Sequence, residues 1–189
     1  MLNEKAHTVE VWAKLLLSAE DRRRIRDFFV SECGIRKGYV VRHMHLTVYH
    51  ARRPLPGLVG VREPASVILS AAETRFMPMT PRGENPRPEI EPARYPIGIR
   101  IHRQSTAMPA VQLYRSRLLK YETPAVLGGR KPSTHKRSAF GARAFQPHVS
   151  LLYAESGIDP DLKPIGHRFR EVIGNLTFDT FRIEIDHNR

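Results

Sequence analysis

Short runs of alternating hydrophobic and polar residues recur along the chain, a pattern typical of half-buried strands. They cover residues 8–17, about 39–51, 95–102, 145–152 and 175–186, the last with one register irregularity. Residues 66–80 favour one or two further strands, although their Ala-Ala-Glu centre also allows a helix. The pattern therefore predicts a chain rich in strands.

Apolar residues at helical spacing predict helices between these strands. The first is expected to begin after Ser18 as N-cap, with Asp21 in the capping-box position, and to end near Gly34. A second is expected from Ser105 to about residue 121, and a short third one over 161–173. Together with the strands, these helices predict an α+β fold.

Two segments lack apolar periodicity and are predicted to be loops. Residues 81–94 hold four prolines. Residues 128–143 are basic, with no acidic residue, and lead directly into the strand near residue 148. This second loop is well placed to hold phosphates, and Arg143 at its end is a candidate contact; a flexible solvated loop is the equal alternative.

The same small motif occurs in two of the strands. Of the nine histidines, only His45 and His148 have a hydroxyl residue two places on, namely Thr47 and Ser150. Because side chains in a strand alternate between faces, each imidazole shares a face with its hydroxyl. If the two strands lie side by side, both pairs converge on one site.

Two histidines and two hydroxyls suit the transfer of a phosphoryl group. One imidazole takes a proton from the attacking oxygen while the other gives one to the leaving oxygen. The hydroxyls donate hydrogen bonds to the phosphate oxygens, where negative charge must be held. This chemistry requires no metal, so no cofactor is expected.

Alternation along the first motif strand places His43, His45, Thr47 and Tyr49 on one face and His50 on the other. Tyr49 is a candidate for stacking on a substrate base, with a packed core residue as the alternative. His43 and His45 could instead be two ligands of a metal site. On the second motif strand, Gln146 shares the face of His148 and Ser150 and is a candidate polar contact.

The two motifs, His45-Leu46-Thr47-Val48 and Pro147-His148-Val149-Ser150-Leu151, resemble those of the two-histidine (2H) phosphoesterases. Members include the bacterial RNA 2′,3′-cyclic phosphodiesterases, also called 2′-5′ RNA ligases. The resemblance implies one two-lobed domain over residues 1–189, with antiparallel sheets, flanking helices and a central cleft. It also implies hydrolysis of a 2′,3′-cyclic phosphate or of a 2′-5′-linked or cyclic nucleotide.

Composition agrees with a nucleic-acid substrate. Lys and Arg number 31 against 19 Asp and Glu, for a formal charge of +12, which favours a polyanionic partner such as RNA. Cys33 is the only cysteine, and no stretch reaches the roughly 20 apolar residues of a membrane span. We therefore expect a cytoplasmic monomer without membrane contact. A non-catalytic RNA-binding module and a metal-dependent hydrolase are the alternatives.

Overall fold

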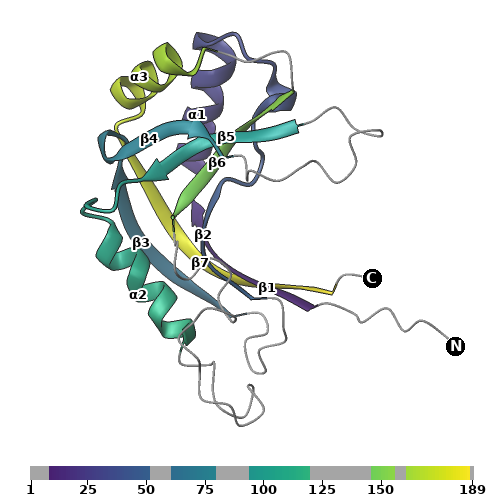
Figure 1. The fold of residues 1–189 in the computed structure, drawn as a ribbon, viewed down its shortest axis with the longest axis vertical. Helices are drawn as coiled ribbons and strands as arrows, with labels where there is room; N and C mark the ends of the chain where they lie inside the picture. The colour runs from purple at the N-terminus through teal and green to yellow at the C-terminus, as the bar shows by residue number, and fades with distance from the viewer. Residues whose placement is uncertain (1–8, 52–60, 80–93, 120–145, 156–160, 188–189) are drawn as a thin grey trace, which may run out of the picture.

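The computed structural model describes residues 9–51, 61–79, 94–119, 146–155 and 161–187 (Figure 1). Seven strands in these residues form one antiparallel sheet: β1 (Val9–Leu17), β2 (His45–Ala51), β3 (Arg62–Ser70), β4 (Thr74–Pro78), β5 (Arg94–Ile101), β6 (His148–Glu155) and β7 (Asn175–His187). The described α-helices are α1 (Ala19–Asp27), α2 (Met108–Leu119) and α3 (Leu162–Ile173). The predicted α+β class is confirmed, with one continuous sheet in place of separate ones.

The strands follow the order β3-β7-β1-β2-β6-β5-β4, and every neighbouring pair is antiparallel. The two motif strands, β2 and β6, are neighbours at the centre. Within their ladder only Leu46 and Val149 pair directly, and Val40 adds an isolated bridge to Leu152. The sheet curls, and α2 and α3 lie on its outer side (Figure 1). A short ladder between the two motif strands thus joins the two halves of the sheet.

Each half repeats the same order of elements. β1, α1 and β2 form a strand-helix-strand unit, and so do β5, α2 and β6. In both units the two strands pair with each other in antiparallel fashion. The order and the pairing of the elements are therefore the same around both motifs.

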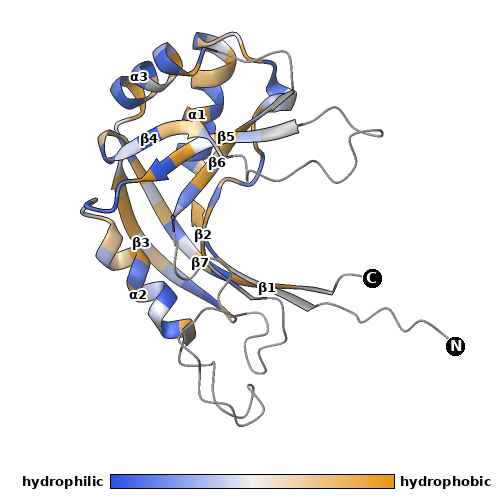
Figure 2. Ribbon diagram, in the orientation of Figure 1, coloured by the Kyte–Doolittle hydropathy of each residue, from blue (hydrophilic) through white to orange (hydrophobic). Residues whose placement is uncertain are grey.

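One face of the sheet packs against the helices and forms the core. Strand residues alternate between buried and more exposed positions, as in β1, where Val11, Ala13 and Leu15 are at most 1% exposed. Apolar segments run along the strands, and α3 is apolar on part of its circumference only (Figure 2). Phe29 and Phe169 stack with ring centroids 6.0 Å apart inside this core, and burial of such a ring stabilises by roughly 1.5–3 kcal/mol.

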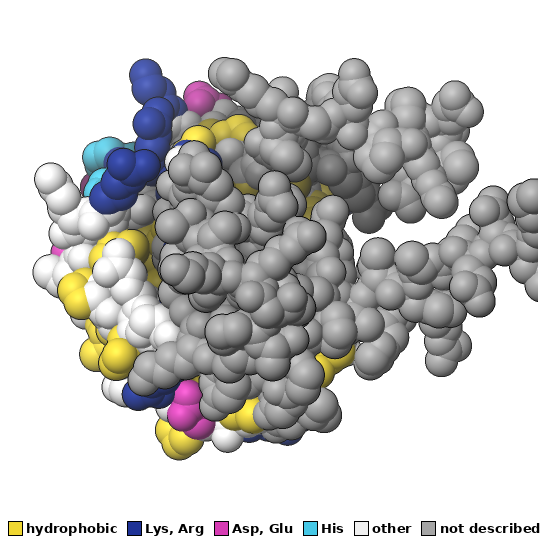
Figure 3. Space-filling view, turned by 60° about the horizontal axis from the view of Figure 1, so that its bottom comes forward, with side chains coloured by type: hydrophobic (Ala, Val, Ile, Leu, Met, Phe, Trp, Pro, Cys, Tyr) yellow, Lys and Arg dark blue, Asp and Glu magenta, His cyan; other side chains and the backbone are white. Residues whose placement is uncertain are grey.

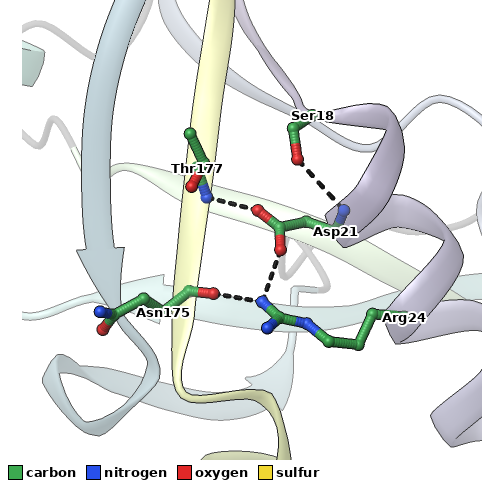
Figure 4. Close-up of polar contacts among 5 residues, drawn as sticks. All are labelled: Ser18, Asp21, Arg24, Asn175 and Thr177. Atoms are coloured by element: carbon green, nitrogen blue, oxygen red, sulfur yellow. Dashed lines mark hydrogen bonds and ion pairs between the residues drawn. The ribbon is translucent and has the colours of Figure 1, made fainter.

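Helix α1 is tied to β7 by a buried carboxylate (Figure 4). Asp21, 5% exposed, accepts hydrogen bonds from the Thr177 amide (2.6 Å) and the Arg24 guanidinium (2.5 Å). Arg24 also donates to the Asn175 carbonyl, and Ser18 Oγ accepts from the Asp21 amide (3.1 Å). The predicted N-cap is confirmed, but the Asp21 side chain bonds β7 and not the Ser18 amide, which donates to the Thr177 carbonyl instead.

Other predicted elements fall close to the observed ones. Residues 66–80 contain the end of β3, a 3₁₀ turn (Ala71–Glu73) and β4, so the strand alternative is confirmed. The first motif strand begins only at His45, because a 3₁₀ turn (Lys37–Tyr39) and a bend precede it. The predicted loop 81–94 lies outside the described residues except for Arg94, which begins β5, and the predicted loop 128–143 lies wholly outside them. Among the described helices, none is long and apolar enough to span a membrane.

Candidate active site

The two motifs place their polar side chains on the face of the sheet opposite the core, which we call the motif face. His45, Thr47 and Ser150 are partly exposed and His148 is exposed, whereas the residues between them are buried. Leu46 and Val149 are both 0% exposed and point into the core. The alternation predicted from sequence is therefore present in both motifs.

The pairing of the two strands brings the motifs together. Leu46 and Val149, the middle residues of the motifs, lie opposite each other. Because the strands are antiparallel, one step from this pair sets His45 beside Ser150 and Thr47 beside His148. Each imidazole thus lies next to the hydroxyl residue of the other motif. This is the convergence that the two separate motifs predicted.

Both imidazoles are oriented in the same way. His45 Nδ1 lies 2.8 Å from the His43 carbonyl oxygen, and His148 Nδ1 lies 3.1 Å from the Gln146 carbonyl oxygen. A carbonyl oxygen can only accept, so each Nδ1 carries the proton and donates it. In the neutral ring Nε2 then holds the free lone pair. Both histidines are thereby oriented to exchange protons through Nε2.

The electrostatic surroundings of His45 favour its neutral form. Burial lowers the pKa of His45 below its ordinary value, and the positive charges of Lys14 and of protonated His148 act in the same direction. The hydrogen bond to the His43 carbonyl and the charge of Glu184 oppose the shift without reversing it. His45 is therefore largely neutral near pH 7 and is able to accept a proton.

Lys14 is a cation beside the first motif that the sequence did not single out. It pairs across the strands with Thr47 and forms an ion pair with Glu184 on β7. Burial opposes ionisation of Glu184, but the Lys14 hydrogen bond and charge, together with Arg182, lower the pKa of the carboxyl overall. Glu184 therefore stays ionised beside the motif, paired with Lys14, whose side chain is 16% exposed.

Both motif strands carry an extra residue immediately after the hydroxyl residue. Lys14 pairs with Thr47 and Ala13 with Tyr49, so Val48 is left over; in β6 the residue left over is Leu151. Such a bulge turns the following side chains over to the other face. The bulges recur at equivalent positions and are thus part of the repeated unit.

The first bulge places Tyr49 and His50 on the faces opposite to those predicted for them. Tyr49 is 3% exposed and belongs to the core, so the packed-core alternative holds and its predicted place beside Thr47 is wrong. His50 was expected on the other face from the motif, but it pairs with Trp12 and stacks on it with ring centroids 3.6 Å apart. The aromatic surface on the motif face is therefore the Trp12–His50 pair.

Gly98 is a further residue that sequence reasoning missed. It pairs with Ser150 at the second bulge, where the β6 backbone comes close to β5. A Cβ atom on Gly98 would lie 1.9 Å from the Val149 carbonyl oxygen, far inside van der Waals contact. Only glycine leaves room for the β6 backbone that carries His148 and Ser150.

The remaining predicted contacts have different outcomes. Gln146 is exposed, and its described contact is the carbonyl that orients His148. Arg143 lies outside the described residues. No group of three or more His, Cys, Asp or Glu that could hold a metal ion occurs in the described part of the chain, so His43 and His45 have no third ligand there.

Lys and Arg side chains form a small group on the surface seen in Figure 3. In the view of Figure 3, described Lys and Arg side chains lie next to histidine at one edge of the molecule. This agrees with the formal charge of +12. Among known proteins, no protein-family model matches the chain, and no curated protein matches it.

Proposed function

We propose that this chain is a metal-independent phosphodiesterase of the 2H type, acting on 2′,3′-cyclic phosphate ends of RNA or on 2′-5′-linked or cyclic nucleotides. The observation that carries the proposal is the crossed arrangement of the motifs. His45 and His148 stand on neighbouring antiparallel strands, each beside the other's hydroxyl residue, and both donate through Nδ1 to a backbone carbonyl. The two-lobed 2H fold, an RNA partner, a monomeric state and a cytoplasmic location belong to the same proposal.

His45 acts as the general base. Its lowered pKa keeps the ring neutral, so Nε2 accepts a proton from the attacking water. The water oxygen then bonds to phosphorus and the bond from phosphorus to one ribose oxygen breaks. His148, in its protonated form, donates a proton to that leaving oxygen. The cyclic diester becomes a phosphate monoester, and a second proton transfer through water restores both rings.

Thr47 and Ser150 hold the phosphate between the two histidines. Their hydroxyls flank the histidines on the same face and donate hydrogen bonds to the non-bridging oxygens. Lys14, opposite Thr47, adds positive charge at the same place. The basic loop 128–143, including Arg143, is proposed to contact further phosphates of the substrate.

The test is a time course with purified protein and EDTA on RNA ending in a 2′,3′-cyclic phosphate. His45→Ala and His148→Ala should each lower turnover by about 10² to 10⁴, the range for a lost general acid or base. The double variant should lose little more than either single one, because the two groups act as a unit. His167→Ala is the control, since His167 is exposed on α3 and paired with Glu171.

Full activity of either single variant would overturn the assignment. Activity lost in EDTA and restored by a divalent metal would favour a metal-dependent hydrolase. Tight RNA binding without turnover by the wild type would favour the non-catalytic binding module.

A further inference from the structure

One rung of residues runs across the motif face at the level of Thr47 and His148. Cross-strand pairs connect Thr47 to Lys14, Lys14 to Arg182 and Arg182 to Arg62. On the other side, His148 pairs with Arg100, which pairs with Arg75. Paired residues share a face, so every strand contributes to this line. We call the rung formed by Arg62, Arg182, Lys14, Thr47, His148, Arg100 and Arg75 the cationic rung.

The neighbouring rung, at the level of His45 and Ser150, has no comparable charge. Its members are Pro64, Thr180, Leu16, His45, Ser150, Gly98 and Met77. Apart from His45 none can ionise. Positive charge on the motif face is therefore gathered along one line and not spread over it.

The cationic rung contains pairs that a sheet ordinarily avoids. Arg62 lies opposite Arg182, and Arg75 lies opposite Arg100, although like charges directly across strands destabilise. Arg100 Nε is buried and has no hydrogen-bond partner among the described residues. Glu184 forms ion pairs with Lys14 and Arg182. No described ion pair neutralises the other arginines of the rung, Arg62, Arg75 and Arg100. Both features suit an anionic ligand that lies along the rung.

We infer that the cationic rung is a track for the phosphates of single-stranded RNA, which crosses the strands and passes over Thr47 and His148. Seven strands spaced by about 4.8 Å give a line of about 29 Å, enough for several nucleotides. The inference rests on the proposed function and narrows its substrate to an oligonucleotide. A mononucleotide would leave the edge arginines, Arg62 and Arg75, without a phosphate.

An aromatic pair stands beside the track. Trp12 is partly exposed and stacks on His50 with an interplanar angle of 12°, one rung beyond Lys14 and Thr47. Proteins that bind single strands combine a basic line with aromatic rings on which bases stack. The Trp12 ring is therefore the surface for a base next to the phosphate at Thr47.

Binding to RNA that cannot be turned over tests the track separately from catalysis. Fluorescein-labelled RNAs of two, four, six and eight nucleotides ending in a 3′-phosphate would be titrated by fluorescence anisotropy over a salt series. Wild type would be compared with Arg62→Gln, Arg75→Gln, Arg100→Gln and Trp12→Ala. The matched control is Arg170→Gln, an exposed arginine on α3, the helix that packs on the core face.

The affinity for RNA should rise with the length of the RNA until the RNA spans the cationic rung. Arg100→Gln should weaken binding of every length by about tenfold or more, as expected for a lost charged contact. Arg62→Gln and Arg75→Gln should weaken only the longer RNAs. Each should lower the slope of log affinity against log salt by about 0.7, the value for one single-strand phosphate. Trp12→Ala should weaken binding with little change in that slope.

Length-independent binding, or rung variants that bind like Arg170→Gln, would overturn the track. Ring opening with a KM that is the same for mononucleotide and octamer would also overturn it, and would leave the proposed function intact. The predicted binding pattern without any ring opening would support the track and overturn the proposed function instead.

Discussion

The strand pairs β1–β2 and β5–β6 are built alike but carry different side chains around the same motif. Both have a histidine, a hydroxyl two residues on and a bulge directly after it. Opposite the histidine stands Leu16 in one pair and Arg100 in the other. Opposite the hydroxyl stand Lys14 and Gly98, respectively.

This difference makes the two copies of the repeated unit unequal around the motifs. The two motif strands are antiparallel, so the position opposite one hydroxyl falls on the same rung as the position opposite the other histidine. Lys14 and Arg100 therefore lie on one rung, and Leu16 and Gly98 lie on the other. A duplicated frame thus places basic residues on one of the two rungs and gives His45 and His148 unlike surroundings.

The largest effect on kcat is expected from removing the hydroxyl of either motif, which also shows whether the two strand pairs contribute equally. Thr47→Val and Ser150→Ala should each lower kcat by about 10² to 10³, because each removes one donor to the charge that develops on phosphate. Steady-state kinetics on a cyclic-phosphate RNA measures both. Ser116→Ala on the outer helix α2 is the control. Wild-type kcat in either variant would remove that hydroxyl from the site.

Much of this arrangement was accessible from the sequence, since the motif alternation is local. Period-two spacing alone shows that His45 and Thr47 share a face, and likewise His148 and Ser150. The bulge after Thr47 was not accessible, because a bulge is defined by the pairing with β1. The faces of Tyr49 and His50 were wrong for that reason.

The cationic rung was hidden for a related physical reason. Its members are spread from Lys14 to Arg182 and meet only through cross-strand register, which depends on long-range packing. The local sequence pattern indicates only the basic segment 128–143 as a phosphate-binding candidate. Gly98 gave no signal beyond a glycine within a strand pattern, and its role depends on the close approach of β6.

The next largest effect should be confined to the second strand pair. Gly98→Ala forces a Cβ against the Val149 carbonyl, 1.9 Å away, and should lower the free energy of unfolding by about 1 to 3 kcal/mol. Thermal unfolding measures this loss, and turnover should fall with it because the same backbone carries His148. Gly38→Ala is the control, since nothing lies within 4 Å of its added methyl group. Equal melting temperatures for the two variants would contradict the packing described at Gly98.

A smaller effect is expected next to the first strand pair, on stability and not on activity. Asp21→Ala leaves the Thr177 amide and the Arg24 guanidinium without their carboxylate acceptor, and should cost about 1 to 2 kcal/mol of unfolding free energy. Denaturant unfolding measures the loss, with exposed Asp27→Ala on the same helix as control. The folded variant should keep wild-type kcat, because the described partners of the Asp21 carboxylate lie on α1 and β7, outside both motifs. A kcat that falls tenfold or more at full folding would contradict that separation.

The pH dependence of kcat/KM tests most directly whether His45 and His148 differ as described. Activity should rise with pH through the pKa of His45, because the base must lose its proton, with a midpoint below about 6.5. Lys14→Met should move this limb to higher pH, since removing the ammonium eases protonation of His45. A wild-type limb above that value, or one that Lys14→Met leaves in place, would contradict His45 as the base.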